Sequence, residues 1–243
     1  MLATDAATWI KTDTHLASLL LPSTPSDPFD AALASHARFN LPEIAVSPLQ
    51  GAFLSTLVRA TRARRVLEVG TLAGYSTLWL AKGLGVPGAP AAATGLPAIV
   101  TLELEEKHAH VARENLARAG ISGQEAELRV GPAVESLRQL VSEGQSFDFV
   151  FIDADKQSYA DYFDLVLQLS RVGTTIISDN VVRQGKITDP TSKDEKVVGV
   201  QRFLKKIQAS PFVESSVLQT VGCKGHDGFA ISVVTTLPSK SRL

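Results

Sequence analysis

Residues 147–185, FDFVFIDADKQSYADYFDLVLQLSRVGTTIISDNVVRQG, decide the fold of this chain. Two apolar runs flank one amphipathic segment, a pattern that predicts two buried strands joined by a helix. Polar residues follow both predicted strand ends: Asp153, Asp155 and Lys156 after the first, and Asp179 and Asn180 after the second. Neighbouring parallel strands lie about 4.8 Å apart, and residues that leave the same edge of such a sheet converge on one crevice. We therefore expect these side chains to meet.

The expected cluster has the chemistry of a site for a divalent cation. Asp153 and Asp179 would supply carboxylates, Asn180 an amide oxygen and Lys156 an ammonium group. Hard oxygen ligands with positions left open for substrate suit Mg²⁺ or a similar ion. Each residue alone has an ordinary interpretation, an Asx turn for Asp179-Asn180 and a solvated side chain for Lys156. Their joint occurrence at two adjacent strand ends favours the metal site.

Outward from this stretch, strands and helices alternate along the chain. The predicted order is RVLEVG (65–70), YSTLWLAKGL (75–84), AIVTLEL (98–104), EKHAHVARENLARAG (106–120), EAELRV (125–130) and AVESLRQLVSEG (133–144), beginning with a strand. Gly120 is the expected residue after the end of its helix, where a left-handed conformation is favoured. Strands that alternate with helices imply a parallel sheet covered by helices on both faces.

The end of the chain breaks this alternation. The β-rich runs FVESSVLQT (212–220) and GFAISVVTTL (228–237) are separated by only about six residues around Gly222–Gly228. That gap is too short for a crossover helix, so the two runs should form an antiparallel hairpin. The predicted fold class is α/β, a doubly wound, mostly parallel seven-stranded sheet with one antiparallel strand and helices on both faces.

The chain is interpreted as a single domain over residues 1–243, with an N-terminal helical arm at 1–46 and a catalytic core at 47–243. Helical spacing at 5–21 and about 28–40 is interrupted by the loop LPSTPSDP. Ser47-Pro48 then opens a further helix, with serine as N-cap and proline at the first helical position. The Gly/Ala/Pro-rich segment at 83–98 is expected to be a solvent-exposed connection.

Composition narrows the class of protein. Charged residues make up 20% of the 243 residues, and the net charge of −1 argues against a nucleic-acid surface. Cys223 is the only cysteine, so the chain has no internal disulfide and a reducing compartment is expected. No apolar run approaches the roughly 20 residues that span a bilayer, and the N-terminus resembles no signal or transit peptide. We expect a cytoplasmic protein without a membrane partner.

The turn after the first strand of the core, Glu68 to Gly74, has the features of a nucleotide site. Glycines there let a ligand approach the backbone closely. A dinucleotide fingerprint requires glycine at position 72, where this chain has leucine. An acid at the end of the next strand, Glu103, instead suits a ligand with a ribose diol and no phosphate, such as S-adenosylmethionine. The alternative is a tight turn and an acid that merely starts a helix.

The motifs VLEVGTLAGYSTLWLA, GPA at 131–133, FIDADKQSY and ISDN together resemble the cation-dependent class I O-methyltransferases. This family includes the caffeoyl-CoA and catechol O-methyltransferase-like enzymes, and the resemblance extends from about Ser47 to the C-terminal hairpin. It implies a Rossmann-like fold, S-adenosylmethionine as methyl donor and a homodimer. By matching positions it implies that Asp153, Asp179 and Asn180 bind the divalent cation, Mg²⁺ first, with Mn²⁺ or Ca²⁺ as alternatives. Residues implied at the donor site are Val46, Glu68, Gly70, Ser76, Glu103, Ala133, Asp153 and Asp155.

Three departures from the family pattern concern the donor and the acceptor. The family usually has Asp at the position of Glu103. Plant members have Asp-Glu-Gly where this chain has Leu49-Gln50-Gly51, and an aromatic Trp where it has Val181-Val182-Arg183. An arginine can stack on an aromatic ring, so Arg183 is the expected substrate contact. The polar segment 181–196 is expected to be a loop over the substrate that selects the acceptor.

The activation of a catechol hydroxyl for methyl transfer gives each of these residues an expected role. A catechol hydroxyl has a pKa near 10 and is a poor nucleophile near pH 7, so chelation by a divalent ion would stabilise the phenolate. Lys156 would take the departing proton, and Asp153 and Asn180 complete the expected catalytic set. We expect metal-dependent methyl transfer from S-adenosylmethionine to a vicinal dihydroxy aromatic of catechol, caffeoyl or flavonoid type. Alternatives are methylation of a hydroxylated tRNA base and a non-catalytic donor-binding module. The basic residues that motivate the tRNA alternative are Arg59, Arg62, Arg64 and Arg65.

Overall fold

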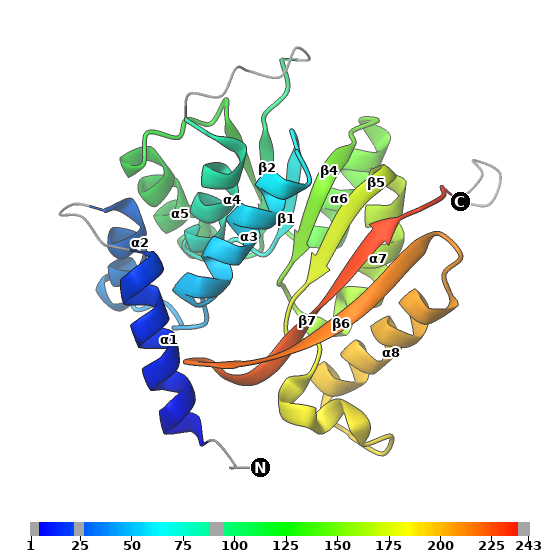
Figure 1. Ribbon diagram of the computed structural model, residues 1–243. Helices are drawn as coiled ribbons and strands as arrows, with labels where there is room; N and C mark the ends of the chain where they lie inside the picture. Colours follow the sequence, from blue (N-terminus) through cyan, green and yellow to red (C-terminus); the bar gives the residue numbers. More distant parts are fainter. Residues whose placement is uncertain (1–4, 22–26, 88–94, 238–243) are drawn as a thin grey trace. The chain divides into compact units, whose positions relative to one another are not determined.

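A computed structural model describes residues 5–21, 27–87 and 95–237 (Figure 1). Its helices are α1 (Ala6–Leu20), α2 (Pro28–Arg38), α3 (Pro48–Ala60), α4 (Tyr75–Leu84), α5 (Glu106–Arg118), α6 (Ala133–Ser142), α7 (Tyr159–Gln168) and α8 (Glu195–Ala209). Short 3₁₀ segments are η1 (Lys156–Ser158) and η2 (Arg183–Thr188). The strands are β1 (Val66–Val69), β2 (Ile99–Glu103), β3 (Ala126–Val130), β4 (Phe147–Ile152), β5 (Ser170–Ser178), β6 (Val213–Gly222) and β7 (Gly225–Val234).

The strands form one seven-stranded sheet in the order β3-β2-β1-β4-β5-β7-β6. Strand pairs β2–β3, β1–β4 and β4–β5 are parallel, and β7 pairs with β5 in the antiparallel direction. The strand order reverses between β1 and β4, which is the position where open α/β sheets bind ligands. The predicted fold class is confirmed.

By internal contacts the chain divides into two compact units. The N-terminal unit comprises Met1–Arg64, Thr71–Gly131 and Val221–Gly225, and the C-terminal unit comprises Arg65–Gly70, Pro132–Thr220 and His226–Leu243.

In the N-terminal unit the helix starts follow from local capping. Ser47 Oγ accepts a hydrogen bond from the Gln50 N–H at 3.2 Å, which confirms the predicted N-cap of α3. Gly120 has φ +76° immediately after the C-cap of α5, as predicted. The core of this unit includes an aromatic cluster in which the ring of Phe29 lies 4.2 Å from that of Trp79. This contact packs α2 against α4.

In the C-terminal unit, α6, α7 and α8 pack side by side against the sheet (Figure 1). Three phenylalanines of β4 are fully buried and, at alternate positions, share one face of this central strand: Phe147, Phe149 and Phe151. Phe203 of α8 contacts the rings of Tyr159 and Phe163 on α7 at centroid distances of 5.6 and 6.0 Å. These contacts hold α7 and α8 beside the ends of β4 and β5.

The predicted lengths of two connections were wrong. The hairpin strands are longer than predicted, because β6 and β7 are joined by Cys223-Lys224 alone rather than by about six residues. The segment 181–196 is not loop throughout: η2 forms within it, kinked at Gln184 and Gly185, which have positive φ, and α8 begins at Glu195. The expected connection at 83–98 lies partly outside the described residues. Among the residues that are described, no helix is long and apolar enough to cross a membrane.

Candidate active site

The ends of β4 and β5 bring the two predicted metal-binding aspartates together. Ile152 and Ser178 are paired in register, and Asp153 and Asp179 are the next residues of the two strands. The Asp179 N–H donates to the Ile152 carbonyl oxygen at 2.9 Å, so the pairing continues past the last register pair. Two carboxylates therefore leave neighbouring strands at the same edge of the sheet, as the sequence predicted.

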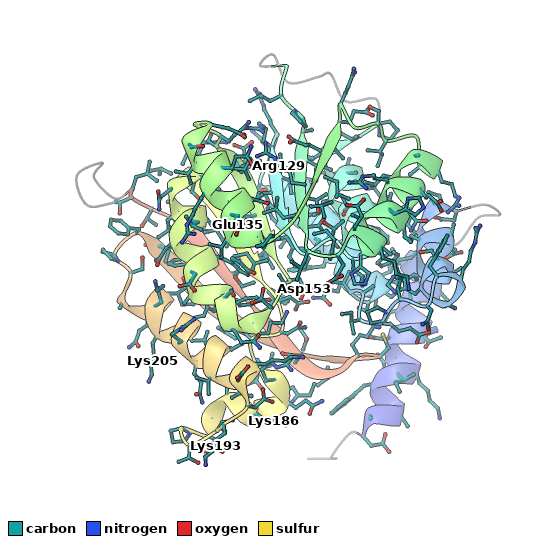
Figure 2. The ribbon with its side chains drawn as sticks, turned by 180° about the vertical axis from the view of Figure 1, so that it is seen from behind. Arg129, Glu135, Asp153, Lys186, Lys193 and Lys205 are labelled. Atoms are coloured by element: carbon teal, nitrogen blue, oxygen red, sulfur yellow. The ribbon has the colours of Figure 1, made fainter. Side chains whose placement is uncertain are left out.

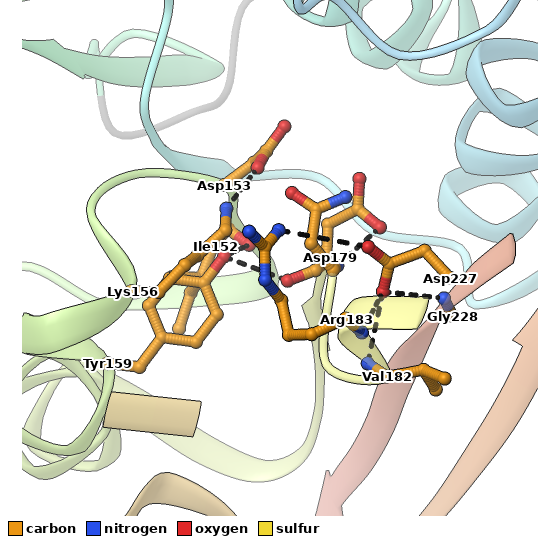
Figure 3. Close-up of polar contacts among 10 residues, drawn as sticks. Ile152, Asp153, Lys156, Tyr159, Asp179, Val182, Arg183, Asp227 and Gly228 are labelled. Carbon is orange, nitrogen blue, oxygen red and sulfur yellow. Dashed lines mark hydrogen bonds and ion pairs between the residues drawn. The ribbon is translucent and has the colours of Figure 1, made fainter. Parts of the chain in front are cut away.

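Lys156 contacts the first of these carboxylates (Figure 3). Its Nζ lies 2.7 Å from Asp153 Oδ1 and 4.9 Å from the ring centroid of Tyr159. The side chain is buried, with 9% of its surface exposed. A charge-assisted hydrogen bond and an aromatic face thus fix the amine beside the strand ends. The interpretation of Lys156 as a solvated surface side chain is wrong.

Tyr159, which was not among the predicted site residues, bridges the ends of β4 and β5. Its hydroxyl donates to the carbonyl oxygens of Ile152 at 3.1 Å and Asp179 at 3.0 Å (Figure 3). Burial, reinforced by the nearby carboxylates of Asp153 and Asp179, raises the pKa of Tyr159 well above its ordinary value. The phenol therefore stays neutral and keeps the proton that it donates. The available signal was its spacing, three residues after Lys156 and thus on the same side of a helical turn.

Asn180 follows Asp179 in a left-handed conformation with φ +56°. Asparagine tolerates this conformation better than most residues. Its backbone N–H lies 2.8 Å from Asp179 Oδ1. The backbone of Asn180 is thus held against the Asp179 carboxylate.

Arg183 is anchored by a residue from the hairpin, Asp227. Asp227 Oδ1 accepts hydrogen bonds from the backbone N–H groups of Val182, Arg183 and Gly228 at 3.0, 2.9 and 3.0 Å, and Oδ2 lies 3.8 Å from Arg183 Nη1 (Figure 3). Arg183 Nε is buried and has no hydrogen-bond partner among the described residues. Asp227 therefore holds the start of the expected substrate loop against β7. No motif in the sequence marked Asp227.

The other predicted donor residues of the C-terminal unit occupy distinct environments. Glu68 of β1 is fully buried, and Ala133 is the first residue of α6. Asp155 is exposed and accepts a hydrogen bond from the hydroxyl of Tyr162. Gly70 has φ +105°, and a Cβ there would lie 2.3 Å from the Asp153 carbonyl oxygen, so only glycine allows β1 to end against Asp153.

Within the N-terminal unit, Glu103 is held by three contacts. Its Oε2 accepts the Leu72 N–H at 2.6 Å, and its Oε1 accepts the Glu105 N–H at 3.0 Å and lies 3.2 Å from His108 Nδ1. Leu72 has φ +51°, an unusual value for a leucine, at the position where a dinucleotide fingerprint has glycine. The carboxylate of Glu103 therefore joins the end of β2 to the turn before α4.

The last two predicted donor residues also belong to the N-terminal unit, and both are buried. Ser76 is the second residue of α4, and Val46 directly precedes the N-cap serine of α3. Ser76 therefore lies in the first turn of α4, and Val46 lies immediately before the cap of α3.

The donor atoms at the ends of β4 and β5 fit a hard divalent cation. Asp153 and Asp179 offer carboxylate oxygens, and Asn180 offers an amide oxygen. Throughout residues 5–21, 27–87 and 95–237, no three histidine, cysteine, aspartate or glutamate side chains form a cluster that could hold a metal. The predicted ligand set differs from such a cluster, because it has two carboxylates, from Asp153 and Asp179, and its third ligand is the amide oxygen of Asn180. His108 and His110 contact different acids, Glu103 and Glu114, and form no metal pair.

Comparison with known proteins identifies the family. The sequence profile of the O-methyltransferase family matches residues 31–230. The chain belongs to this family. Membership confirms the resemblance drawn from the sequence and the predicted class of enzyme.

Several members of the family are similar over most of their length. A catechol O-methyltransferase of Niastella koreensis is 45% identical over 205 residues, which cover 84% of this chain and 88% of that protein. A catechol O-methyltransferase of Mycobacterium tuberculosis is 45% identical over 222 residues, covering 91% and 94%. The crystal structure of an O-methyltransferase from Bacillus cereus in complex with SAH has a TM-score of 0.87 at 46% identity, covering 95% and 100%.

Proposed function

We propose that this O-methyltransferase transfers a methyl group from S-adenosylmethionine to one hydroxyl of a vicinal dihydroxy aromatic, with the help of a divalent cation. The observation that carries the proposal is the cluster at the ends of β4 and β5. There Asp153 and Asp179 follow a register pair, Asn180 lies next in sequence, and Lys156 is 2.7 Å from Asp153. Oxygen ligands beside a fixed amine suit an acceptor that chelates a metal and loses a proton.

The donor assignment rests on the relatives and on the chemistry of the residues. SAH, named with the Bacillus cereus structure, is S-adenosylhomocysteine, the product left when S-adenosylmethionine gives up its methyl group. We assign Glu103 to the donor ribose, since its carboxylate has an acceptor position left for a ribose hydroxyl beside its three contacts within the protein. Further assigned donor contacts are Val46, Glu68, Gly70, Ser76, Ala133, Asp153 and Asp155.

For the cation we assign Asp153, Asp179 and Asn180 as ligands, with Mg²⁺ favoured over Mn²⁺ and Ca²⁺. Bound there, the ion would stabilise the phenolate form of the acceptor and orient it. In its neutral amine form, Lys156 receives the proton of the acceptor hydroxyl on Nζ, while the new bond forms between the phenolic oxygen and the methyl carbon and the carbon–sulfur bond of the donor breaks. Because Asp153 and the Tyr159 ring hold Lys156, little reorganisation is needed for this transfer.

The acceptor assignment follows from the relatives named catechol O-methyltransferase and from the charges after β5. Arg183 starts η2, and Lys186 and Lys193 are exposed on the segment that leads to α8 (Figure 2). We propose that Arg183, Lys186 and Lys193 favour catechols with acidic or polyhydroxylated substituents, such as caffeate or flavonoids.

The decisive experiment combines binding and turnover. We expect isothermal titration to show binding of S-adenosylmethionine, and we expect methyl transfer to a catechol that stops with EDTA and returns with Mg²⁺. Phenol and a monomethylated catechol are the matched acceptor controls, since neither can chelate through two hydroxyls. Undiminished transfer after thorough chelation, or equal rates on phenol, would contradict the metal role.

The alternative acceptor, a tRNA base, was suggested by four arginines, of which Arg59, Arg62 and Arg64 are exposed and Arg65 is not. Arg65 is buried, and its guanidinium donates to the Ser146 carbonyl oxygen at 2.9 Å and to Gln145 Oε1 at 2.8 Å. The guanidinium of Arg65 therefore forms its hydrogen bonds within the C-terminal unit. A non-catalytic role is not favoured either, because the oxygen ligands and Lys156 are all present.

We also propose that the protein acts as a homodimer in the cytoplasm. No residue of α1 is buried, and its apolar residues Leu19 and Leu20 are 62% and 67% exposed. Apolar side chains gathered on such a helix are commonly covered by another protein surface. We expect light scattering at micromolar concentration to give twice the 25.9 kDa mass of the chain, and a monomer would contradict the proposal.

A further inference from the structure

Glu103 has a partner that its assigned role does not explain. Besides two backbone N–H groups, its carboxylate contacts the side chain of His108, with 3.2 Å between Nδ1 and Oε1. Only 9% of the Glu103 side chain and 20% of the His108 side chain are exposed. Solvent therefore screens the interaction between His108 and Glu103 little. This interaction helps to fix the orientation of the Glu103 carboxylate.

The direction of this hydrogen bond follows from chemistry. An ionised carboxylate only accepts hydrogen bonds, so Nδ1 of His108 carries the proton that is shared with Oε1. The other oxygen of Glu103 accepts the N–H of Leu72, whose φ of +51° is strained for a residue with a side chain. Rotation of the carboxylate away from His108 would thus also release the backbone of the turn before α4.

The length of Glu103 makes such an anchor necessary. Glutamate has one more rotatable bond than the aspartate that usually stands at this position in the family, so more conformational entropy is lost when it is held in one orientation. A side chain that already holds the carboxylate in the free protein reduces the loss on binding. His108 is placed to do this from the first turn of α5.

We propose that His108 is a positioning residue for the methyl donor: it orients Glu103 toward the donor ribose and thereby stabilises the Leu72 turn. This inference rests on the proposed function, in which Glu103 binds the donor. His108 acts through Glu103, so its loss should weaken donor binding and leave the methyl-transfer step intact.

The chain provides a matched control two residues later on the same helix. Nε2 of His110 lies 3.3 Å from Glu114 Oε1, but 65% of the His110 side chain and 40% of the Glu114 side chain are exposed. Exposed pairs of this kind contribute little to stability. A substitution at His110 therefore removes the same type of contact from the same helix without touching Glu103.

The test compares full-length His108→Leu, His108→Asn, His108→Gln and His110→Leu with the wild type. Titration with S-adenosylhomocysteine should give a Kd raised about 3- to 30-fold in His108→Leu, less than the roughly 10- to 150-fold that corresponds to loss of a direct hydrogen bond to a charged group, because His108 acts through Glu103. The KM for the donor should rise while kcat changes little. Asparagine places an amide N–H near the position of Nδ1, so His108→Asn should recover most of the affinity, and His110→Leu should bind like the wild type.

The outcomes separate this inference from the proposed function. A wild-type protein that binds no S-adenosylhomocysteine overturns both. If the wild type binds and His108→Leu binds within twofold of it, only the role of His108 is overturned. Should His108→Leu not fold, the comparison of asparagine with glutamine decides, because glutamine places its amide near the position of Nε2. Tighter binding by His108→Asn supports the inference, and equal binding contradicts it.

Discussion

Asp179 and Lys156 lie at the same edge of the sheet, and single substitutions should distinguish the separate tasks that we propose for them. Asp179 is 4% exposed and directly precedes Asn180. Asp179→Ala removes one proposed ligand of the cation without touching Glu103, so we expect turnover to be lost while the Kd for S-adenosylhomocysteine stays within about threefold. Isothermal titration and a methyl-transfer assay measure the two effects. Asp161→Ala, at an exposed aspartate of α7, is the control and should leave both unchanged.

Lys156→Ala should lower kcat by roughly 10²–10⁴-fold, the usual contribution of a general base. The substitution also leaves Asp153 without its 2.7 Å partner, so binding of Mn²⁺, followed by its paramagnetic resonance, should be measured in the same variant. Retained Mn²⁺ binding with reduced kcat identifies proton transfer as the function lost. Lys205→Ala, at an exposed lysine of α8 (Figure 2), is the surface control. A kcat within threefold of the wild type would show that Lys156 is not the base.

Individual site residues could be predicted from the sequence where a carboxylate follows the end of a predicted strand. Asp153 and Asp179 could be placed together because each follows the end of a predicted strand, and parallel strands end at one edge. Asp227 could not be foreseen. It reaches Val182 and Arg183 through the antiparallel strand β7, and the register of that pairing is not encoded by any local motif. The partners of Glu103 were likewise hidden, because they depend on side-chain rotamers.

Between elements, the packing of α8 on η1 fixes the position of Lys156. Gly199 of α8 lies against the backbone of η1: a Cβ there would be 2.3 Å from the Lys156 carbonyl oxygen. Gly199→Ala must push the two elements apart, and insertion of a methyl group into a packed site costs about 1–3 kcal/mol. We expect a lower free energy of unfolding in urea together with a reduced kcat. Val198→Ala, next in sequence and 44% exposed, is the control. A Gly199→Ala protein with wild-type kcat would show that η1 tolerates the displacement.

The elements themselves were predicted better than their connections. Periodicity placed the strands and helices of the core, and capping residues such as Ser47 and Gly120 marked ends correctly. The hairpin turn was misjudged because Gly225 and Gly228 resemble turn residues although both lie within β7. The segment η2 was missed because its polar sequence has no apolar period. The start of η2 is held by Asp227, which is distant in sequence and accepts a hydrogen bond from the Arg183 N–H.

For the whole molecule, the buried phenol of Tyr75 predicts how stability depends on alkaline pH. Burial, assisted by the charges of Asp30 and Asp27, raises the pKa of Tyr75 to about 12 from an ordinary value of 10.0. Between these values the unfolded chain releases the phenolic proton and the folded protein keeps it, so the unfolded state binds fewer protons and the free energy of unfolding falls as pH rises. The contribution is complete below pH 10 and is lost by about pH 12.

Urea unfolding at pH 8, 9, 10 and 11 measures this dependence, and Tyr75→Phe isolates the contribution of one group. A single tyrosine can change the free energy of unfolding by up to about 1.4 kcal/mol per pH unit in this window. We expect the variant to lose stability less steeply than the wild type between pH 10 and 11, and to run parallel to it between pH 8 and 9. The thiol of Cys223, whose pKa is also raised by burial, is removed from both proteins by Cys223→Ser so that it does not contribute. Identical slopes above pH 10 would mean that Tyr75 ionises in the folded protein as readily as in the unfolded chain.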